Sequence, residues 1–399
     1  MVQQTLKDIF SNYVSSANII FKNKDVLSHN YVPEVTYHRE EQIRQLANIL
    51  APSLKGHGVS NCFLYGKTGT GKTLVAKNVT SELKKTNNNI NILYINCKMK
   101  KISDTEYRLL AEMSRLLGKE VPPTGLPTDA VYNVFLSAVE NLGGNLILIL
   151  DEIDALVNKI GDEILYNLTR INQNINTTKV SIIGISNSVS FLETLDPRVR
   201  STLSEEEIIF PPYNYNQLKD ILKQRADMAF NDGVIQPGVI EKCAALAAQE
   251  HGDARKALDL LRIAAELAER EKSPNVEIRH VDMAESKLDS DRIIEIVRMQ
   301  PKQSLAVLAA IIRLVESKQE DIQTGDVFSI YEEICSRTGL KILTQRRVSD
   351  LIAELDMLGI INTRVISKGR YGRTREIRIT LGEPITENIK KILRENYLL

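Results

Sequence analysis

The stretch GKTGTGKT, from Gly66 to Thr73, limits the fold more than any other part of the chain. It fits the pattern GxxxxGK[ST], follows the apolar run NCFLY and precedes a helical pattern that begins LVAKNV. Glycines let such a loop turn its backbone N–H groups toward phosphate oxygens, and the start of the following helix adds partial positive charge. A strand, this loop and a helix in this order indicate an α/β fold that binds a nucleotide.

Each part of the loop has a predicted role. Lys72 is expected to reach the β- and γ-phosphates, and the Thr73 hydroxyl is expected to ligate Mg²⁺. A chance glycine-rich turn is the alternative interpretation, and the strand and helix on either side argue against it. The residues predicted to surround the phosphates are Gly66, Lys67, Thr68, Gly69, Thr70, Gly71, Lys72, Thr73 and Leu74.

Two acidic residues further along complete this predicted site. LILILDEID places Asp151 and Glu152 at the end of an apolar strand, and ligands of open α/β sheets bind beyond the carboxyl ends of the strands. We expect Asp151 to hold Mg²⁺, directly or through water, and Glu152 to be the general base for the attacking water. The next apolar run ends at Asn187, whose amide is predicted to orient that water. A kinase fits less well, because the acid pair suits water activation better than an acceptor site.

Three arginines are candidates for stabilising charge at the γ-phosphate. Arg198 and Arg200 follow a proline-marked turn in LDPRVRSTL, and Arg255 begins a helical pattern in HGDARKALDLL. Arginine near a γ-phosphate stabilises the transition state, from the same chain or from a neighbouring subunit. For either Arg198 or Arg200 alone, an ordinary surface arginine is an equally good interpretation. Arg255 is expected to reach the γ-phosphate when its small helical domain closes.

The order of strand and helix patterns predicts three domains. The runs NCFLY, INILYIN, NLILILD and VSIIGIS alternate with helical stretches, which is typical of a parallel sheet buried on both faces. After FPPY the strand pattern stops, and residues 216–290 are predicted to be helical. A third segment begins near Pro301 with three helical patterns and a basic hairpin. The predicted domains are an α/β nucleotide-binding domain with the N-terminal segment at 1–213, a helical lid at 214–295 and a DNA-binding domain at 296–399.

The third domain has the pattern of a winged helix. In TQRRVSDLIAELDMLGII, Val348, Leu351, Ile352 and Leu355 form an apolar stripe, and Thr344 can cap the start of that helix. Helix-turn-helix modules point this end of the helix into the major groove, where arginine and glutamine read base edges. The candidate contacts on the helix are Gln345, Arg346, Arg347 and Ser349.

Positive charge is concentrated in ISKGRYGRTREIRIT, although the chain carries 51 basic and 51 acidic residues. The stretch alternates as two strands, and we predict that it is a wing that meets the phosphate backbone of DNA. The alternative is a solvated hairpin whose charges only keep an edge strand soluble. The predicted wing contacts are Lys368, Arg370, Arg373 and Arg375.

Composition excludes several other classes of protein. Of the 399 residues 43% are hydrophobic and 26% are charged, as in a soluble globular protein, and no apolar run is long enough to span a membrane. The start MVQQTLKDIF has no basic region followed by an apolar core, so we do not expect it to be a secretory signal. The four cysteines are far apart, which argues against a thiolate metal site and suits a reducing interior. Together with the predicted DNA-binding domain, these features lead us to expect a cytoplasmic protein associated with the chromosome.

These motifs together resemble those of the AAA+ ATPases. More closely, the chain is similar over nearly its whole length to the archaeal replication initiators related to the origin recognition complex and the cell-division-control loader. The phosphate loop alone would indicate only a nucleotide triphosphatase. The combination of HREEQ, GDARKAL and LTQRRVSDLIAELDMLGII with LDEID and FPPYNYNQLKDILKQR carries the more specific resemblance.

The resemblance implies roles for further residues. Asn187 would be sensor one and Arg255 sensor two. Tyr213 and Arg225 would line the ATP or ADP site where it meets the lid, and the segment from Val32 to Arg39 would border the adenine. The family also carries an insertion that touches DNA, and the matching stretch here is EVPPTGLPTD, from Glu120 to Asp129.

One position departs from the family pattern. Many relatives have an arginine after the serine of the RVRS motif, and this chain has Thr202. The choice between Arg198 and Arg200 as an arginine finger for a neighbouring subunit therefore stays open.

The most consistent interpretation is an initiator that binds duplex DNA at replication origins and uses ATP with Mg²⁺ as a switch with slow hydrolysis. Recruitment of the replicative helicase is implied by the resemblance alone, as is assembly with paralogous initiator subunits on DNA. Two alternatives remain at this stage. One is a nucleotide-gated transcription regulator, which would bind at promoters. The other is a clamp-loader-type ATPase, which would have fast turnover and no sequence preference on DNA.

Overall fold

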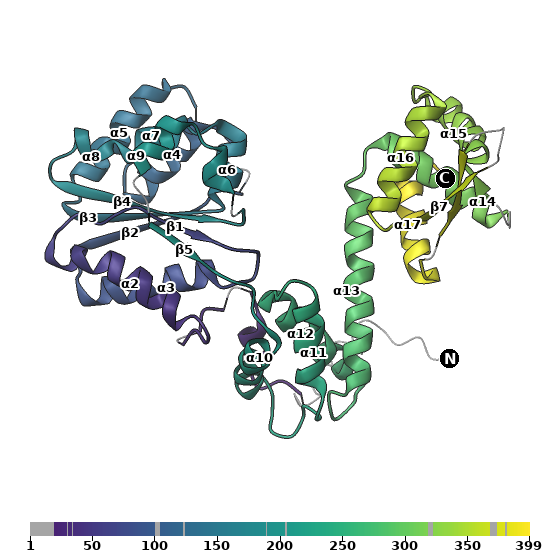
Figure 1. Ribbon diagram of the computed structural model, residues 1–399, viewed down its shortest axis with the longest axis horizontal. Helices are drawn as coiled ribbons and strands as arrows, with labels where there is room; N and C mark the ends of the chain where they lie inside the picture. The colour runs from purple at the N-terminus through teal and green to yellow at the C-terminus, as the bar shows by residue number, and fades with distance from the viewer. Residues whose placement is uncertain are drawn as a thin grey trace, which may run out of the picture. The chain divides into compact units, whose positions relative to one another are not determined.

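The structure is a computed structural model that describes residues 20–29, 31–33, 35–99, 104–122, 124–188, 190–203, 206–317, 322–367, 373–379 and 381–399. Its contacts divide the chain into two compact units, one ending at Val281 and the other beginning at Asp282. Figure 1 shows the elements of each unit. Within the described residues, no helix combines the length and the apolar character that crossing a membrane requires.

A five-stranded parallel sheet forms the centre of the first unit, with strand order β2-β3-β4-β1-β5. The strands are β1 (Cys62–Tyr65), β2 (Ile90–Asn96), β3 (Gly144–Asp151), β4 (Thr178–Ser186) and β5 (Glu206–Ile209). The first four confirm the predicted strands. The sequence analysis missed β5 because it is a four-residue edge strand that begins with two glutamates, and only Ile208 in it is buried.

Helices cover both faces of this sheet (Figure 1). On one face lie α2 (Glu40–Leu50) and α3 (Lys72–Thr86), the second of which is the helix predicted after the phosphate loop. Their buried residues pack with the strand side chains of that face into one core. A second core fills the other face, under α4 (Glu106–Leu116), α5 (Thr128–Glu140), α6 (Ile153–Ile160), α7 (Glu163–Thr169), α8 (Ile171–Asn174) and α9 (Pro197–Leu203). Short 3₁₀ turns lie at η2 (Ala51–Lys55) and η3 (Phe191–Thr194).

The lid of the first unit is helical, as predicted. It contains α10 (Tyr215–Ala229), α11 (Val239–Gln249), α12 (Ala254–Arg270) and the start of α13 (Ile278–Arg298). The predicted boundary at 295/296 falls inside α13, because nothing in the sequence interrupts that helix before Pro301.

The described part of the N-terminal segment packs against this lid. The Lys22 amide donates to the Ala229 carbonyl at 2.8 Å, and the rings of Phe21 and Phe230 lie 5.3 Å apart. A 3₁₀ turn, η1 (Lys24–Leu27), follows. The segment was grouped with the nucleotide domain from its position in the sequence. In the structure η1 contacts α10 and α12, whereas Pro33 and Thr36 accept hydrogen bonds from Asn78 of α3.

The second unit has the architecture of a winged helix. Its helices are α14 (Lys302–Glu316), α15 (Thr324–Thr338), α16 (Gln345–Met357) and α17 (Glu383–Glu395). Its sheet has the order β6-β8-β7, from β6 (Ile322–Gln323), β7 (Asn362–Ser367) and β8 (Arg373–Arg378), and the pairs are antiparallel. The three predicted helices and the hairpin are confirmed. The prediction missed α17, which packs Ile389, Ile392 and Leu393 into the core.

A substitution at Gly184 of β4 tests how tightly side chains pack on the central sheet. It lies opposite Phe63 in the β1–β4 register, and a Cβ atom there would lie 2.4 Å from Phe63 Cε1. Because Phe63 is completely buried, Gly184→Ala should lower the free energy of unfolding by about 1–3 kcal/mol through overpacking. Urea unfolding monitored by circular dichroism measures this. Gly58→Ala is the control, since the nearest atom to a Cβ atom at this position would be Lys179 Cδ, at 3.6 Å. Equal stability of the two variants would contradict the prediction.

Candidate nucleotide-binding site and DNA interface

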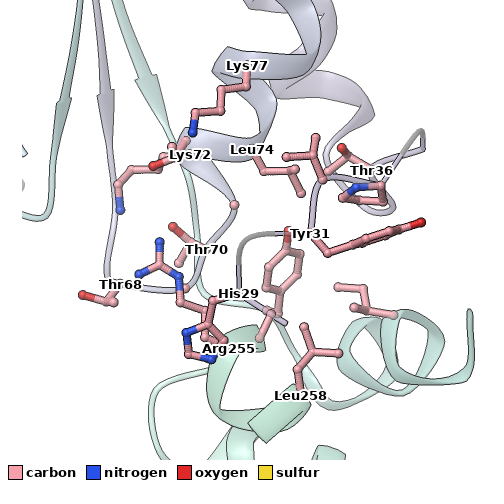
Figure 2. A pocket seen from close by; sticks show the side chains of 18 of the residues that line it. His29, Tyr31, Thr36, Thr68, Thr70, Lys72, Leu74, Lys77, Arg255 and Leu258 are labelled. Carbon is pink, nitrogen blue, oxygen red and sulfur yellow. The ribbon is translucent and has the colours of Figure 1, made fainter. Parts of the chain in front are cut away.

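A cavity of about 590 Å³ lies where the phosphate loop, the ends of β2 and β3, the N-terminal segment and the lid meet. Figure 2 shows Thr68, Thr70 and Lys72 of the loop bordering it together with Arg255 and Leu258 of α12. A volume of this size is typical of small-ligand sites. Of the predicted loop residues, Thr68 to Leu74 form part of the wall, and Gly66 and Lys67 do not.

Lys72 is the buried cation at the centre of the loop. Its Nζ donates to the carbonyls of Gly66 at 2.7 Å and Lys67 at 2.8 Å, and to Asn187 Oδ1 at 3.0 Å. Burial lowers the pKa of the Lys72 ammonium to about 8, an effect opposed by the charge of Asp151 and reinforced by that of Arg255. The structure thus brings together Lys72 and Asn187, which the sequence analysis placed in one site although they stand 115 positions apart.

The Asp151 carboxylate is held by three hydrogen bonds. Oδ2 accepts from Thr73 Oγ1 at 2.9 Å and from the Tyr94 hydroxyl at 2.8 Å, while Oδ1 accepts from the Glu152 amide at 3.0 Å. Burial and the charge of Asp151 both raise the pKa of the Tyr94 phenol, so the phenol stays protonated and donates.

A hydroxyl beside a carboxylate is the kind of oxygen ligand set that Mg²⁺ uses in nucleotide sites. No group of three or more His, Cys, Asp or Glu side chains that could hold a metal occurs in the described part of the chain. Mg²⁺ sites that share the ion with phosphates need fewer protein ligands than that. Thr73 and Asp151 therefore fit the predicted role, with phosphate oxygens and water completing the coordination.

Glu152 lies at the start of α6 with its backbone in the left-handed region, at a φ of 56°. Its carboxylate borders the cavity and pairs with Lys98 Nζ at 3.4 Å. Lys98 follows the end of β2 and is mostly exposed, so this ion pair is weak and easily opened.

The first turn of α12 rests directly on the phosphate loop. The Ala254 amide donates to the Gly69 carbonyl at 3.3 Å, and Asp253 caps the helix by accepting from the Arg255 amide at 2.8 Å. Gly69 has a φ of 72°, and a Cβ atom there would overlap Asp253 Oδ1 at 1.7 Å. Glycine is required at this position on both counts, and the contact brings Arg255 to the wall of the cavity.

The residues predicted to border the adenine or line the site where it meets the lid divide into two groups. Val32, Tyr213 and Arg225 line the cavity, and Arg225 lies 4.6 Å from the centre of the Tyr31 ring. Arg39 is not part of the cavity wall. It is buried behind the loop, where it donates to the carbonyls of Thr70 at 2.9 Å and Pro211 at 2.6 Å and stacks on Tyr213 at 3.8 Å. Arg39 is therefore placed to support the loop.

Arg198 and Arg200 lie on α9 and do not line this cavity. The Arg198 side chain is 85% exposed and pairs with Asp196 at 3.2 Å. Both arginines are thus exposed on the surface, outside the cavity. The stretch from Glu120 to Asp129 connects α4 and α5 and continues into α5 at Thr128; Pro123 lies outside the described residues.

Sequence reasoning missed several residues of the cavity wall. Tyr94 was interpreted as one more apolar member of a buried strand, and His29 and Tyr31 stand in an N-terminal segment without a motif. Strand alternation in INILYIN could have placed Tyr94 on the same face as Asn96, near the strand end. No pattern in the sequence reveals His29, whose Nε2 lies 2.8 Å from Asp259 Oδ2 of α12.

In the second unit, α16 has the predicted form of a recognition helix. Thr344 caps it by accepting from the Arg347 amide at 3.4 Å, and the predicted apolar stripe is buried. Gln345, Arg346 and Arg347 are exposed at its start, and Ser349 is half-buried. Arg347 is not free, because its Nη1 lies 3.4 Å from Glu354 Oε1 and 3.9 Å from Asp350 Oδ2. Arg346 has no hydrogen-bond or ion-pair partner within the described ranges.

The hairpin of the predicted wing is formed by β7 and β8, with Ser367 opposite Arg373. Arg375 extends toward the helix, where Nη1 donates to the Ser349 carbonyl at 3.4 Å. Its position braces the wing strand against α16. Lys368 and Arg370 lie outside the described residues.

Three family models match the chain. They are the ATPase family associated with various cellular activities (AAA) over residues 62–212, the Cdc6 AAA+ ATPase-type lid domain over 219–286 and the CDC6 C-terminal winged helix domain over 295–388. Fold and site thus define a nucleotide-binding AAA+ protein with a helical lid and a winged helix.

Individual relatives narrow this class. ORC1-type DNA replication protein 1 of Archaeoglobus fulgidus is 52% identical over 396 residues, which cover 98% of this chain and 95% of the relative. The ORC1-type DNA replication protein of Pyrococcus furiosus is 52% identical over 403 residues, covering 99% and 94%. The solved structure of the Aeropyrum pernix ORC1 protein in complex with DNA matches with a TM-score of 0.79 and 43% identity, covering 96% of this chain and 99% of that one. The chain belongs to the family of ORC1-type DNA replication proteins.

The lowered pKa of Lys72 makes nucleotide binding depend on pH. Without ligand, Lys72 is charged below its pKa of about 8 and increasingly neutral above it. Phosphate oxygens favour the charged form, so binding above pH 8 takes up a proton. Affinity should therefore fall by about tenfold between pH 7 and pH 9. Calorimetry in buffers of different ionisation enthalpy detects the uptake directly. Lys72→Arg, which stays charged, is the control; equal affinity of the parent at both pH values would refute the prediction.

Proposed function

We propose that this replication initiator binds ATP or ADP with Mg²⁺ and uses the nucleotide state to control its binding to duplex DNA at replication origins. The observation that carries the proposal is the shared cavity. Lys72 of the phosphate loop and Arg255 of the lid line one space, so a bound γ-phosphate would touch both parts. The proposed division of functions is 1–213 for nucleotide binding, 214–295 for the lid and 296–399 for DNA, with α13 running across the last boundary.

We propose slow hydrolysis of ATP at this site. Mg²⁺, held by Thr73 and Asp151, would neutralise charge on the β- and γ-phosphates. Glu152 accepts a proton from the attacking water once its ion pair with Lys98 opens, and Asn187 orients that water from the end of β4. Because no arginine of α9 lines the cavity, completion of the site would need a neighbouring subunit, which favours a switch over a fast motor.

Arg255 supplies the proposed link between nucleotide and lid. It follows Asp253 and Ala254, whose contacts with Gly69 already join α12 to the loop. Arg198 or Arg200 acts in trans, on the nucleotide of a neighbouring paralogous subunit on DNA. That role fits their exposure on α9.

The proposed DNA contacts lie in the second unit. The start of α16 presents Gln345, Arg346 and Arg347 for base edges, and the hairpin supplies Lys368, Arg370 and Arg373 for phosphates. The DNA complex of the Aeropyrum pernix relative supports this part of the proposal. Such a protein is associated with the chromosome. Recruitment of the replicative helicase is proposed from membership in the family.

Glu152→Gln tests the assigned base. The amide cannot accept a proton, so turnover should fall by about a hundredfold, within the range typical of general-base loss. ATP affinity should stay within about twofold, because the side chain makes no hydrogen bond to the loop. Single-turnover hydrolysis and equilibrium binding of labelled ATP measure the two effects. Glu140→Gln, an exposed acid at the end of α5, is the control. Turnover equal to that of the parent would exclude Glu152 as the base.

Arginine variants in the second unit test the proposed DNA binding. Arg346→Ala should cost about 1–3 kcal/mol at one base position and relax the choice there. Arg370→Ala should weaken binding to origin and scrambled duplexes alike. It should also reduce the slope of the logarithm of the binding constant against the logarithm of the salt concentration by about 0.9. Titrations of both duplexes at four salt concentrations separate the two behaviours.

Arg44→Ala, an exposed arginine on α2 of the other unit, is the matched control. If Arg346→Ala and Arg370→Ala both bind like the parent at every salt concentration, neither the helix nor the hairpin is a DNA-binding surface. Parent binding that is insensitive to ATP and ADP would contradict the proposed switch.

A further inference from the structure

Asp151 is the acid proposed to hold Mg²⁺, and the Tyr94 side chain holds Asp151. The Tyr94 hydroxyl donates to Oδ2 at 2.8 Å, slightly shorter than the 2.9 Å bond that the same oxygen accepts from Thr73. Thr73 is an expected residue of the phosphate loop. Tyr94 belongs to no motif and comes from the neighbouring edge strand.

The hydroxyls of Thr73 and Tyr94 determine how the Asp151 carboxylate can coordinate an ion. A carboxylate oxygen has two lone-pair positions in the plane of the group. The hydroxyls of Thr73 and Tyr94 occupy both positions on Oδ2, and the Glu152 amide occupies one on Oδ1. Counting the partners within the described part of the chain, Asp151 therefore has one open position, on Oδ1, through which it can bind an ion directly or through water. The Thr73 oxygen keeps its own lone pairs for the ion while its proton points to Asp151.

The Tyr94 ring is itself fixed from two sides. Its strand pairs with β3 in parallel register, Tyr94 opposite Ile149 and Asn96 opposite Asp151. Lys77 of α3, one turn beyond the phosphate loop, places its Nζ 4.1 Å from the ring centre. A cation over an aromatic face is attracted to the ring. Tyr94 thus joins the helix that carries Thr73 to the strand that carries Asp151.

We propose that Tyr94 is a positioning residue for the Mg²⁺ site. Its phenol sets the rotation of the Asp151 carboxylate, so that the open lone pair of Oδ1 faces the metal when MgATP binds. The inference rests on the proposed binding of ATP with Mg²⁺ and adds a residue to it. Partners that orient a metal-binding carboxylate typically change metal affinity by about 10–100-fold. Because Thr73 and the Glu152 amide still hold Asp151, removal of the Tyr94 hydroxyl should change the metal affinity by about tenfold, the lower end of this range.

The test separates metal from nucleotide. Affinity for a fluorescent ATP analogue is measured in EDTA and over a series of Mg²⁺ concentrations. For Tyr94→Phe, the Mg²⁺ concentration that gives half of the affinity gain should rise by about tenfold. Its affinity in EDTA should stay within about twofold of the parent, because the ring and its contact with Lys77 remain. Binding of Mn²⁺ to the nucleotide complex, followed by electron paramagnetic resonance, should weaken in parallel.

Tyr132→Phe is the matched control, because it removes a tyrosine hydroxyl from the same unit. That hydroxyl donates to the Asn167 carbonyl at 3.4 Å and does not border the cavity. The control variant should follow the parent in both conditions.

Two results for Tyr94→Phe would overturn the inference. One is an unchanged Mg²⁺ dependence. The other is an equal loss of affinity with and without Mg²⁺, which would show a general role in the shape of the cavity. A parent whose affinity for ATP does not respond to Mg²⁺ would instead refute the proposed cofactor, whatever the variant does.

Discussion

The contact between the first turn of α12 and the phosphate loop joins the two halves of the nucleotide site. Ala254 donates to the Gly69 carbonyl, and the Asp253 carboxylate occupies the space that any side chain at Gly69 would need. A loop that arranges its N–H groups around phosphate cannot shift without moving the lid helix that rests on it. The loop and the first turn of α12 are therefore in direct contact, so a shift of one displaces the other.

Burial gives the charges of this site their strength. Lys72 is almost inaccessible to solvent, and its three hydrogen bonds go to oxygens that phosphate oxygens would replace or join. Asp151 is buried too, held by Thr73, Tyr94 and the Glu152 amide. Away from bulk water such groups interact more strongly and cannot rearrange freely. The site is thus preorganised around the ligand positions, while the more exposed Lys98–Glu152 pair is the part free to change.

In the second unit the arginines of the candidate DNA-binding surface are not deeply buried, unlike the buried charges of the nucleotide site. Arg346 stands free among the described residues, whereas Arg347 is engaged by two acids of its own helix and Arg375 by a carbonyl of α16. Arginines that look equivalent in the sequence therefore differ: one is available to a base, one must first leave Glu354, and one fixes the hairpin to the helix. The net charge of zero is compatible with DNA binding because only the local field near this helix and hairpin acts on the duplex.

The sequence by itself determined the phosphate loop, the acid pair, four of the five strands of the large sheet, the helical lid and the winged helix, because each has a local pattern of glycine, charge or apolar spacing. It also placed Lys72, Asp151, Glu152, Asn187 and Arg255 in one site. Tertiary structure alone decided that Arg39 supports the loop from behind, that the N-terminal segment packs on the lid, that the brief strand β5 closes the sheet edge and that Tyr94 and His29 reach the cavity. These depend on which segments become neighbours, and a tyrosine in an apolar strand has the same local pattern whether its hydroxyl meets solvent or the carboxylate of Asp151. Local periodicity in the sequence determines where a helix or strand forms. Only the packing of elements that are distant in the sequence determines which side chains contact one another.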